Sequence, residues 1–410
     1  MALATGKRPK PPADLFFEAA AVALTRMSGG WRRFYRGTWF YRRLLRGQLA
    51  DHISFSPVDA LPRRLEDADA LLHGRFRFGG ETVAAMAGGG SIFDAKPPSR
   101  EWEEALNAFE WLPPLSAAGG DPARVLATNL IAQWLRRNQR YREPAFLPHI
   151  VARRLIHLFC HGRFVVVNSD PLWRSRLFVS LREQARLLER TAGEAPEGLP
   201  RIESAAALAL SGLCLEDNSL RLTAGLGMLE TELSRQILPD GGAIDRSPYT
   251  LAEVFRLLVM VMDTMVEAGE EVPQFLHNAH DRMAPTIRFF RHGDGKLALF
   301  NGGAEGDDDT LSWLLSHDDA RGKPFAFARH SGYQRLLAGR TLVLFDCGVP
   351  PPGPFSCHAH AGCLAFELSA GPQRIVVNCG AAALPCHRKW ETVLRATAAH
   401  STATLADTSN

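Results

Sequence analysis

Two histidines separated by one residue form the densest group of possible metal ligands or bases, His358 and His360, in Cys-His-Ala-His-Ala-Gly. On an extended strand, residues two apart point to the same side, so the imidazoles are expected to share one surface. Two imidazoles on one face can begin a zinc site, or one can bind metal while the other moves protons. The pair by itself does not decide between these chemistries.

Two later residues could complete such a site. Asn378 lies on the next expected strand, and His400 follows the stretch that begins at Arg395. A tight hairpin at Gly371 would leave Asn378 about three residues, roughly 10 Å, out of register with His360. Bringing them together therefore requires a longer loop or a bulge, and an amide oxygen is a poorer zinc ligand than a carboxylate.

A tyrosine earlier in the chain could supply acid and base chemistry. Tyr249 ends the segment Leu-Pro-Asp-Gly-Gly-Ala-Ile-Asp-Arg-Ser-Pro-Tyr, and Arg246 precedes it by three residues. A phenol can act as base and then as acid when a neighbouring cation lowers its pKa. Arg246 could be that cation, or could bind a carboxylate through two nitrogens. Packing at a helix start is the competing interpretation of Tyr249.

The elements that must position these residues are helices first and strands afterwards. Between about 100 and 290, apolar residues recur at three- and four-residue steps, which indicates helices. The predicted helices are 122–137, 150–161, 172–191, 204–214, 219–237 and 250–268. Gly and Pro separate them, which is typical of antiparallel helical hairpins.

After about 293 the pattern changes to short runs of branched and aromatic residues, which predict strands. They are Lys296–Phe300, Tyr333–Ala338, Thr341–Cys347, Cys363–Ser369 and Gln373–Cys379, with a last run at Thr402–Leu405. Because that run nearly reaches the last residue, the sheet looks unfinished, and we expect either a truncated version of a longer protein or strands that pair elsewhere. The expected division is a basic segment 1–58, a helical domain 59–292 and a β domain 293–410.

Composition restricts the partners. A net charge of +3 over 410 residues gives no indication of nucleic acid, although residues 1–50 hold ten Lys or Arg against two acids. Aromatics interleave with arginines in residues 26–46, a segment that could contact an anionic polymer or lipid surface. A helix docked on the protein's own body is the favoured interpretation. No run approaches the ~20 apolar residues of a transmembrane helix, and no clear signal peptide is present, which leaves the cytoplasm open.

Together the motifs resemble the heparinase II/III family of polysaccharide lyases. The resemblance rests on His358-Ala359-His360-Ala361-Gly362, Phe366-Glu367-Leu368, Ile375 to Gly380, Arg395 to Thr402, and the loop from Leu238 to Tyr249. It covers roughly 60–402 and is more specific in the β half. It implies an incomplete (α/α) toroid followed by an antiparallel β-sandwich, and a cell-envelope or periplasmic location.

The resemblance also implies roles for residues. Its zinc ligands would be His360, Asn378 and His400, with His358 catalytic or facing substrate and Tyr249 the base or acid. Such lyases cleave acidic polysaccharides, glycosaminoglycans among them, beside a uronic acid by β-elimination. A base removes the proton at C5, a neutralising group holds the carboxylate, and an acid protonates O4.

Two departures from the family pattern concern activity. Asn378 stands where the family has an aspartate ligand, and the family's asparagine–histidine pair is replaced by Leu-Pro-Arg-Ile-Glu at 199–203, where Arg201 is the candidate substitute for binding substrate. Three hypotheses follow: a lyase acting on acidic polysaccharide, a non-catalytic glycan-binding or cell-envelope protein on the same scaffold, and a metal-dependent hydrolase using the three histidines. The sequence predicts neither the sugar nor the oligomeric state.

Overall fold

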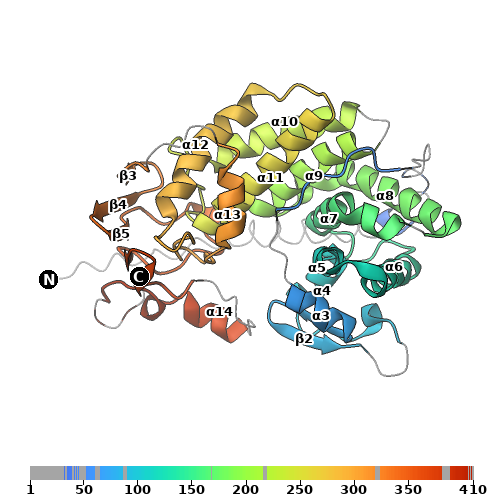
Figure 1. Cartoon of the computed structure of the whole chain (residues 1–410), viewed down its shortest axis with the longest axis horizontal. Helices are drawn as coiled ribbons and strands as arrows, with labels where there is room; N and C mark the ends of the chain where they lie inside the picture. Colours follow the sequence, from blue (N-terminus) through green and yellow to red (C-terminus); the bar gives the residue numbers. More distant parts are fainter. Residues whose placement is uncertain are drawn as a thin grey trace, which may run out of the picture.

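The chain folds into a helical body followed by an antiparallel sheet, as the fold-class prediction stated (Figure 1). The computed structural model describes residues 52–60, 65–85, 90–167, 169–215, 219–318, 324–380 and 388–404, with Arg32, 35–38, Tyr41, Arg43, Leu45, Ala406 and Thr408. Among these residues, no helix combines the length and the apolar character that crossing a membrane requires.

The body is an incomplete (α/α) toroid of helices that follow one another through short loops. They are α3 (Leu65–Leu72), α4 (Arg100–Ala108), α5 (Leu112–Ala118), α6 (Gly120–Arg137), α7 (Pro148–Val166), α8 (Pro171–Thr191), α9 (Leu199–Cys214), α10 (Ser219–Gln236), α11 (Pro248–Glu267) and α12 (Gln274–Phe290). The six helices predicted from apolar spacing correspond to α6 to α11, with ends that differ by a few residues.

Helix α9 lies at the centre of the body, where it packs against α7, α10 and α11. Residues 205–207 are fully buried alanines. A Cβ added at Gly212 would lie 2.5 Å from the backbone nitrogen of Leu222, and one at Gly225 would overlap the backbone of Ala209. Helices α9 and α10 can therefore approach closely only because Gly212 and Gly225 lack a side chain.

The sheet has the order β3–β4–β5–β6–β7, and each neighbouring pair is antiparallel. Its strands are β3 (Phe327–Ala328), β4 (Tyr333–Ala338), β5 (Thr341–Asp346), β6 (Phe366–Ala370) and β7 (Gln373–Val376). One face is buried against the body, where the rings of Tyr333 and of Phe290 in α12 pack edge to face with their centroids 4.8 Å apart. Figure 1 shows the sheet beside α12 at one end of the body, with α3 at the other end.

Several local predictions are wrong. The front half is not entirely helical, because β1 (Arg75–Phe78) and β2 (Glu81–Ala84) form a hairpin. Residues 296–300 are not a strand, since Leu297 makes only an isolated bridge to Arg291 and the amide of Leu299 donates to a side chain, Glu367. Residues 402–404 are also outside any strand, and Leu405 lies outside the described residues.

Short helices interrupt the β half. They are α13 (Asp308–Leu315), α14 (Arg388–Leu394), η3 (Gly353–Phe355) and η4 (Thr397–Ala399), with η1 (Ile92–Asp94) and η2 (Ala192–Glu194) in the body. After η3 the chain turns at residues 357 and 358, so His358 and His360 do not lie on a strand as predicted. The division at 292 and 293 stays a prediction.

Candidate functional site

Tyr249 lies in the first turn of α11. Ser247 caps the helix by accepting a hydrogen bond from the amide of Thr250 (3.4 Å), and Pro248 begins the helix, where no amide donor is needed. The Tyr249 side chain is 37% exposed and lines a cleft in the body. The phenol can therefore meet a ligand from solvent.

The loop before Tyr249 is held by Asp240. Its Oδ2 accepts hydrogen bonds from the amides of His330 and Ser331, both at 2.7 Å. The neighbouring Gly241 has a φ of +82°, and a Cβ there would overlap the carbonyl of Arg282. The Asp-Gly-Gly sequence thus fixes the loop between α12 and the entrance to the sheet.

Arg246 is buried and fully engaged by the protein. Its Nη2 forms an ion pair with Asp346, Nε donates to the carbonyl of Ser331 (2.9 Å) and Nη1 to that of Val349 (3.0 Å). The guanidinium also lies over the Tyr333 ring, 4.8 Å from its centre. This geometry makes Arg246 an anchor of the loop, and binding a uronate would require its ion pair to open.

His360 and His400 form a hydrogen-bonded imidazole pair, with His360 Nδ1 3.1 Å from His400 Nε2. His400 Nδ1 lies 2.9 Å from the carbonyl of Ala396. A carbonyl only accepts, so in the neutral pair His400 carries its proton on Nδ1, and its Nε2 accepts a hydrogen bond from the Nδ1–H of His360. Burial lowers the pKa of His360 to about 4 and also lowers the pKa of His400, which keeps both neutral at pH 7.

Arg395 holds the loop that carries the histidines. Its Nε donates to the carbonyl of Ala359 (3.0 Å), and its own carbonyl accepts from the amide of Ala361 (2.9 Å). Arg395 is therefore a cation beside the exposed His358. The sequence analysis did not identify Arg395 as a site residue.

Asn301 bridges the tyrosine loop and the histidine loop. Its Nδ2 donates to the carbonyl of Arg246 (3.3 Å), and its Oδ1 accepts from the amide of His360 (3.5 Å). Burial raises the pKa of Asp245, and hydrogen bonds with the Ser247 backbone and the Thr250 side chain oppose that rise. The two loops that carry the predicted acid and base residues are thus neighbours.

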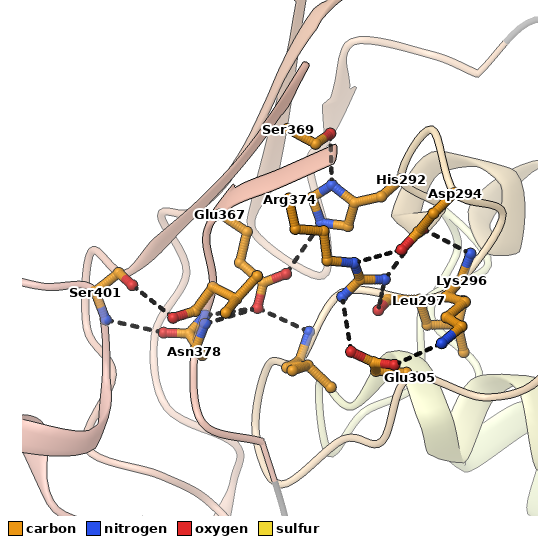
Figure 2. A network of polar contacts seen from close by, with 12 residues as sticks. His292, Asp294, Lys296, Leu297, Glu305, Glu367, Ser369, Arg374, Asn378 and Ser401 are labelled. Atoms are coloured by element: carbon orange, nitrogen blue, oxygen red, sulfur yellow. Dashed lines mark hydrogen bonds and ion pairs between the residues drawn. The ribbon is translucent and has the colours of Figure 1, made fainter. Parts of the chain in front are cut away.

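Asn378 belongs to a buried network around Glu367, shown in Figure 2. Glu367 Oε1 accepts hydrogen bonds from the backbone and side-chain nitrogens of Asn378, both at 3.1 Å. His292 Nε2 lies 3.0 Å from Glu367 Oε2, and both side chains are fully buried. The Asn378 oxygen accepts from the amide of Ser401 (3.1 Å). The amide group therefore joins β6 to the segment after His400.

These contacts determine how well a zinc ion fits. Two imidazoles stand at a separation that a shared ion could span, but the third predicted donor, Asn378, faces Glu367 and Ser401. No group of three or more His, Cys, Asp or Glu side chains that could hold a metal occurs in the described part of the chain. The residues present therefore do not complete the ligand set expected from the family.

Arg201 does not face the cleft. Its Nε and Nη2 donate to the carbonyl of Ala195 (3.0 and 2.6 Å), and its Nη1 to Glu197 (3.0 Å). The next polar residue on α9, Glu203, does line the cleft. Where the family has its asparagine–histidine pair, this chain therefore presents a carboxylate to the cavity.

The helical cleft has a volume of about 410 Å³. Its charged lining residues are Asp67, Arg77, Glu110, Arg153, Glu203, Glu253 and Arg256, and its other lining residues include Tyr249, His157, Phe78 and Trp111. Sequence reasoning missed these charged residues. They could have been found from charged residues inside apolar helical runs, such as Arg153 in α7 and Glu203 in α9. A charge seldom lies in a core without a partner, so such a residue indicates a buried ion pair or a cleft.

The described part of the basic segment docks on the protein itself. Arg36 donates to both oxygens of Glu194 (2.7 and 2.8 Å), while Tyr41 and Leu45 are buried. Arg186 donates to the carbonyl of Leu45 (2.9 Å). Residues 26–31, 33, 34, 39, 40, 42, 44 and 46 lie outside the described residues, and contact with an anionic surface stays a prediction.

Three comparisons with known proteins agree with this fold. Residues 320–410 match the family model "Heparinase II/III-like, C-terminal". The structure is similar to that of heparinase III, with a TM-score of 0.70 and 16% identity over 90% of this chain and 66% of that one. It is also similar to heparan sulfate lyase HepC from Pedobacter heparinus, with a TM-score of 0.55 and 20% identity over 90% and 65%.

A curated relative is similar in sequence. It is FtsZ-localized protein C of Caulobacter vibrioides (strain NA1000 / CB15N), 34% identical over 331 residues. This chain thus spans 56% of that relative's length and about two thirds of the two solved lyase chains. The fold is that of a polysaccharide-lyase scaffold, and residues 320–410 are similar to the C-terminal part of heparinase II/III-like proteins.

Proposed function

We propose that this protein is a glycan-binding protein that keeps the lyase scaffold without efficient β-elimination. Elimination needs a group that neutralises the uronate carboxylate, because that charge opposes removal of the C5 proton. The supporting observation is that Arg246 already forms an ion pair with Asp346, and Arg201 is engaged by Ala195 and Glu197.

The family relative supports the same proposal. The name FtsZ-localized protein C describes where that protein is found and specifies no reaction. A protein that binds a cell-envelope glycan needs a cleft and an exposed aromatic side chain, and this chain has both in the cleft lined by Tyr249. A cell-envelope location is part of the proposal.

Elimination on an acidic polysaccharide is the second candidate, favoured by the position of Arg395. Tyr249 and His358 are both exposed, Asn301 links the loop before α11 to the histidine loop, and Arg395 contacts the histidine loop. Arg395 would hold the uronate, and either Tyr249 or His358 would remove the C5 proton.

The test is incubation of the protein with a panel of uronate polymers, with near-ultraviolet absorbance of unsaturated uronates followed over time. Binding to glycans is measured separately by calorimetry. We expect saccharide binding without absorbance. Steady absorbance that is lost in Tyr249→Phe, with the folded state unchanged by circular dichroism, would overturn the proposal in favour of the lyase.

A further inference from the structure

The guanidinium groups of the helical cleft are all bound to carboxylates. Arg153 Nε donates to both oxygens of Glu203, each at 2.9 Å. Arg256 Nη2 lies 3.1 Å from Glu253. The third pair, Arg77 and Asp67, is 3.3 Å apart at the rim.

The lining has no excess of positive charge. It contains four carboxyl groups, from Asp67, Glu110, Glu203 and Glu253, and three guanidinium groups, and burial raises the pKa of Glu110. His157 adds no charge at pH 7, because burial lowers its pKa to about 4. Behind the cleft wall, Arg256 also lies 3.7 Å from Asp59. An anionic ligand would therefore meet carboxylates and would have to displace them from their arginines.

The same groups suit a ligand that donates hydrogen bonds. Carboxylates accept from sugar hydroxyl, amide N–H and ammonium groups. Tyr249 and the apolar lining residues Phe78 and Leu257 offer contact area for the faces of sugar rings. The volume of about 410 Å³ lies in the range of small-ligand pockets.

We infer that the helical cleft selects a saccharide without acid groups, uncharged or amino-bearing, and disfavours the uronate polymers expected from the scaffold. The inference rests on the proposed glycan-binding function and specifies the ligand class of that site. The cleft bounded by α7, α9 and α11 binds sugar hydroxyl and amide donors through its carboxylates, while its arginines hold those carboxylates in position.

The test compares three oligosaccharides of equal length by calorimetry at low ionic strength: an N-acetylglucosamine oligomer, its de-N-acetylated form and a uronate oligomer. We expect at least one of the first two to bind about tenfold or more tightly than the uronate, because like charges across a binding site oppose association. Tighter binding of the uronate, without near-ultraviolet absorbance, would overturn this inference alone. Failure of every saccharide to bind would overturn the proposed function and this inference with it.

Variants locate the selectivity in the cleft. Glu203→Gln releases Arg153 and is expected to raise affinity for the uronate oligomer about tenfold relative to the N-acetylated one. Since Glu203 is buried, Asp67→Asn at the rim is a second variant, expected to shift the ratio in the same direction.

The control is Asp121→Asn. It removes the carboxylate of an exposed ion pair between Asp121 and Arg124 on α6, and neither residue lines the cleft. We expect the control to leave the ratio unchanged. The role of the carboxylates would be refuted if both cleft variants kept the parent's ratio of uronate affinity to N-acetylglucosamine affinity while their melting temperatures stayed near that of the parent.

Discussion

The guanidinium of Arg246 and the carboxylate of Asp346 form an ion pair whose side chains are only 8% and 6% exposed. The pair joins the loop before α11 to the end of β5, and so sets the position of Tyr249 relative to the sheet.

Arg246→Gln is expected to lower the free energy of unfolding by about 3–5 kcal/mol, because removing one partner leaves a buried, unpaired charge. Urea denaturation measures this loss. The matched control is Arg124→Gln, whose exposed pair with Asp121 should contribute about 0–1 kcal/mol. Equal losses in the two variants would mean that the Asp346 carboxylate is solvated or protonated after the change.

Two glycines of α10 are expected to respond oppositely to alanine. At Gly225 the added Cβ would overlap the backbone of Ala209, whereas at Gly227 nothing lies within 4 Å. Gly225→Ala should destabilise the protein by about 1–3 kcal/mol through overpacking, and Gly227→Ala should stabilise it by about 0.5–1 kcal/mol through helix propensity. Thermal unfolding compares them, and a stabilising Gly225→Ala would contradict the close approach of α9 and α10.

Stability should depend on pH through His157. Burial holds its pKa at about 4 against an ordinary 6.5, so between these values the unfolded chain binds more protons than the folded one. Stability is therefore expected to fall by roughly 3 kcal/mol as pH decreases from 6.5 to 4 because of this residue. His157→Asn keeps a donor for the carbonyl of Ala108 and should flatten the slope. An unchanged slope in urea titrations across this range would exclude His157 as its source.

Zinc binding, predicted from the family resemblance, has a direct test. With two imidazoles and an amide already used by Glu367 and Ser401, we expect weak binding that is lost on dialysis against a chelator. Asn378→Asp places a carboxylate in the family's ligand position and should strengthen zinc binding by at least about tenfold. Competition with a chromophoric chelator measures both proteins. Equal affinities would place the ion elsewhere, and tight binding by the parent protein would show that Asn378 turns toward the imidazoles.

Local pattern was sufficient for much of the architecture. Apolar residues at helical spacing predicted α6 to α11, because one face of each helix must be buried and that requirement is written in consecutive residues. The alternation in Leu364 to Leu368 also predicted a strand, which the structure has as β6, but the buried face of β6 carries Glu367 and Ser369 and not the apolar residues. The run at 296–300 was wrongly predicted to be a strand. Its apolar residues are buried by the surrounding fold, but its backbone makes only an isolated bridge to Arg291 and a hydrogen bond to the Glu367 side chain.

The sequence by itself determined which residue types were present for chemistry, including the His-x-His pair, Tyr249 and the substitution of Asn378 for aspartate. Only the tertiary structure decided which charges remained available, since Arg246 and Arg153 are bound by carboxylates 100 and 50 residues away in the chain. Ion pairs of this kind depend on distance in space, which a linear pattern does not encode. The same limitation concealed the helical cleft, whose walls come from helices far apart in the sequence.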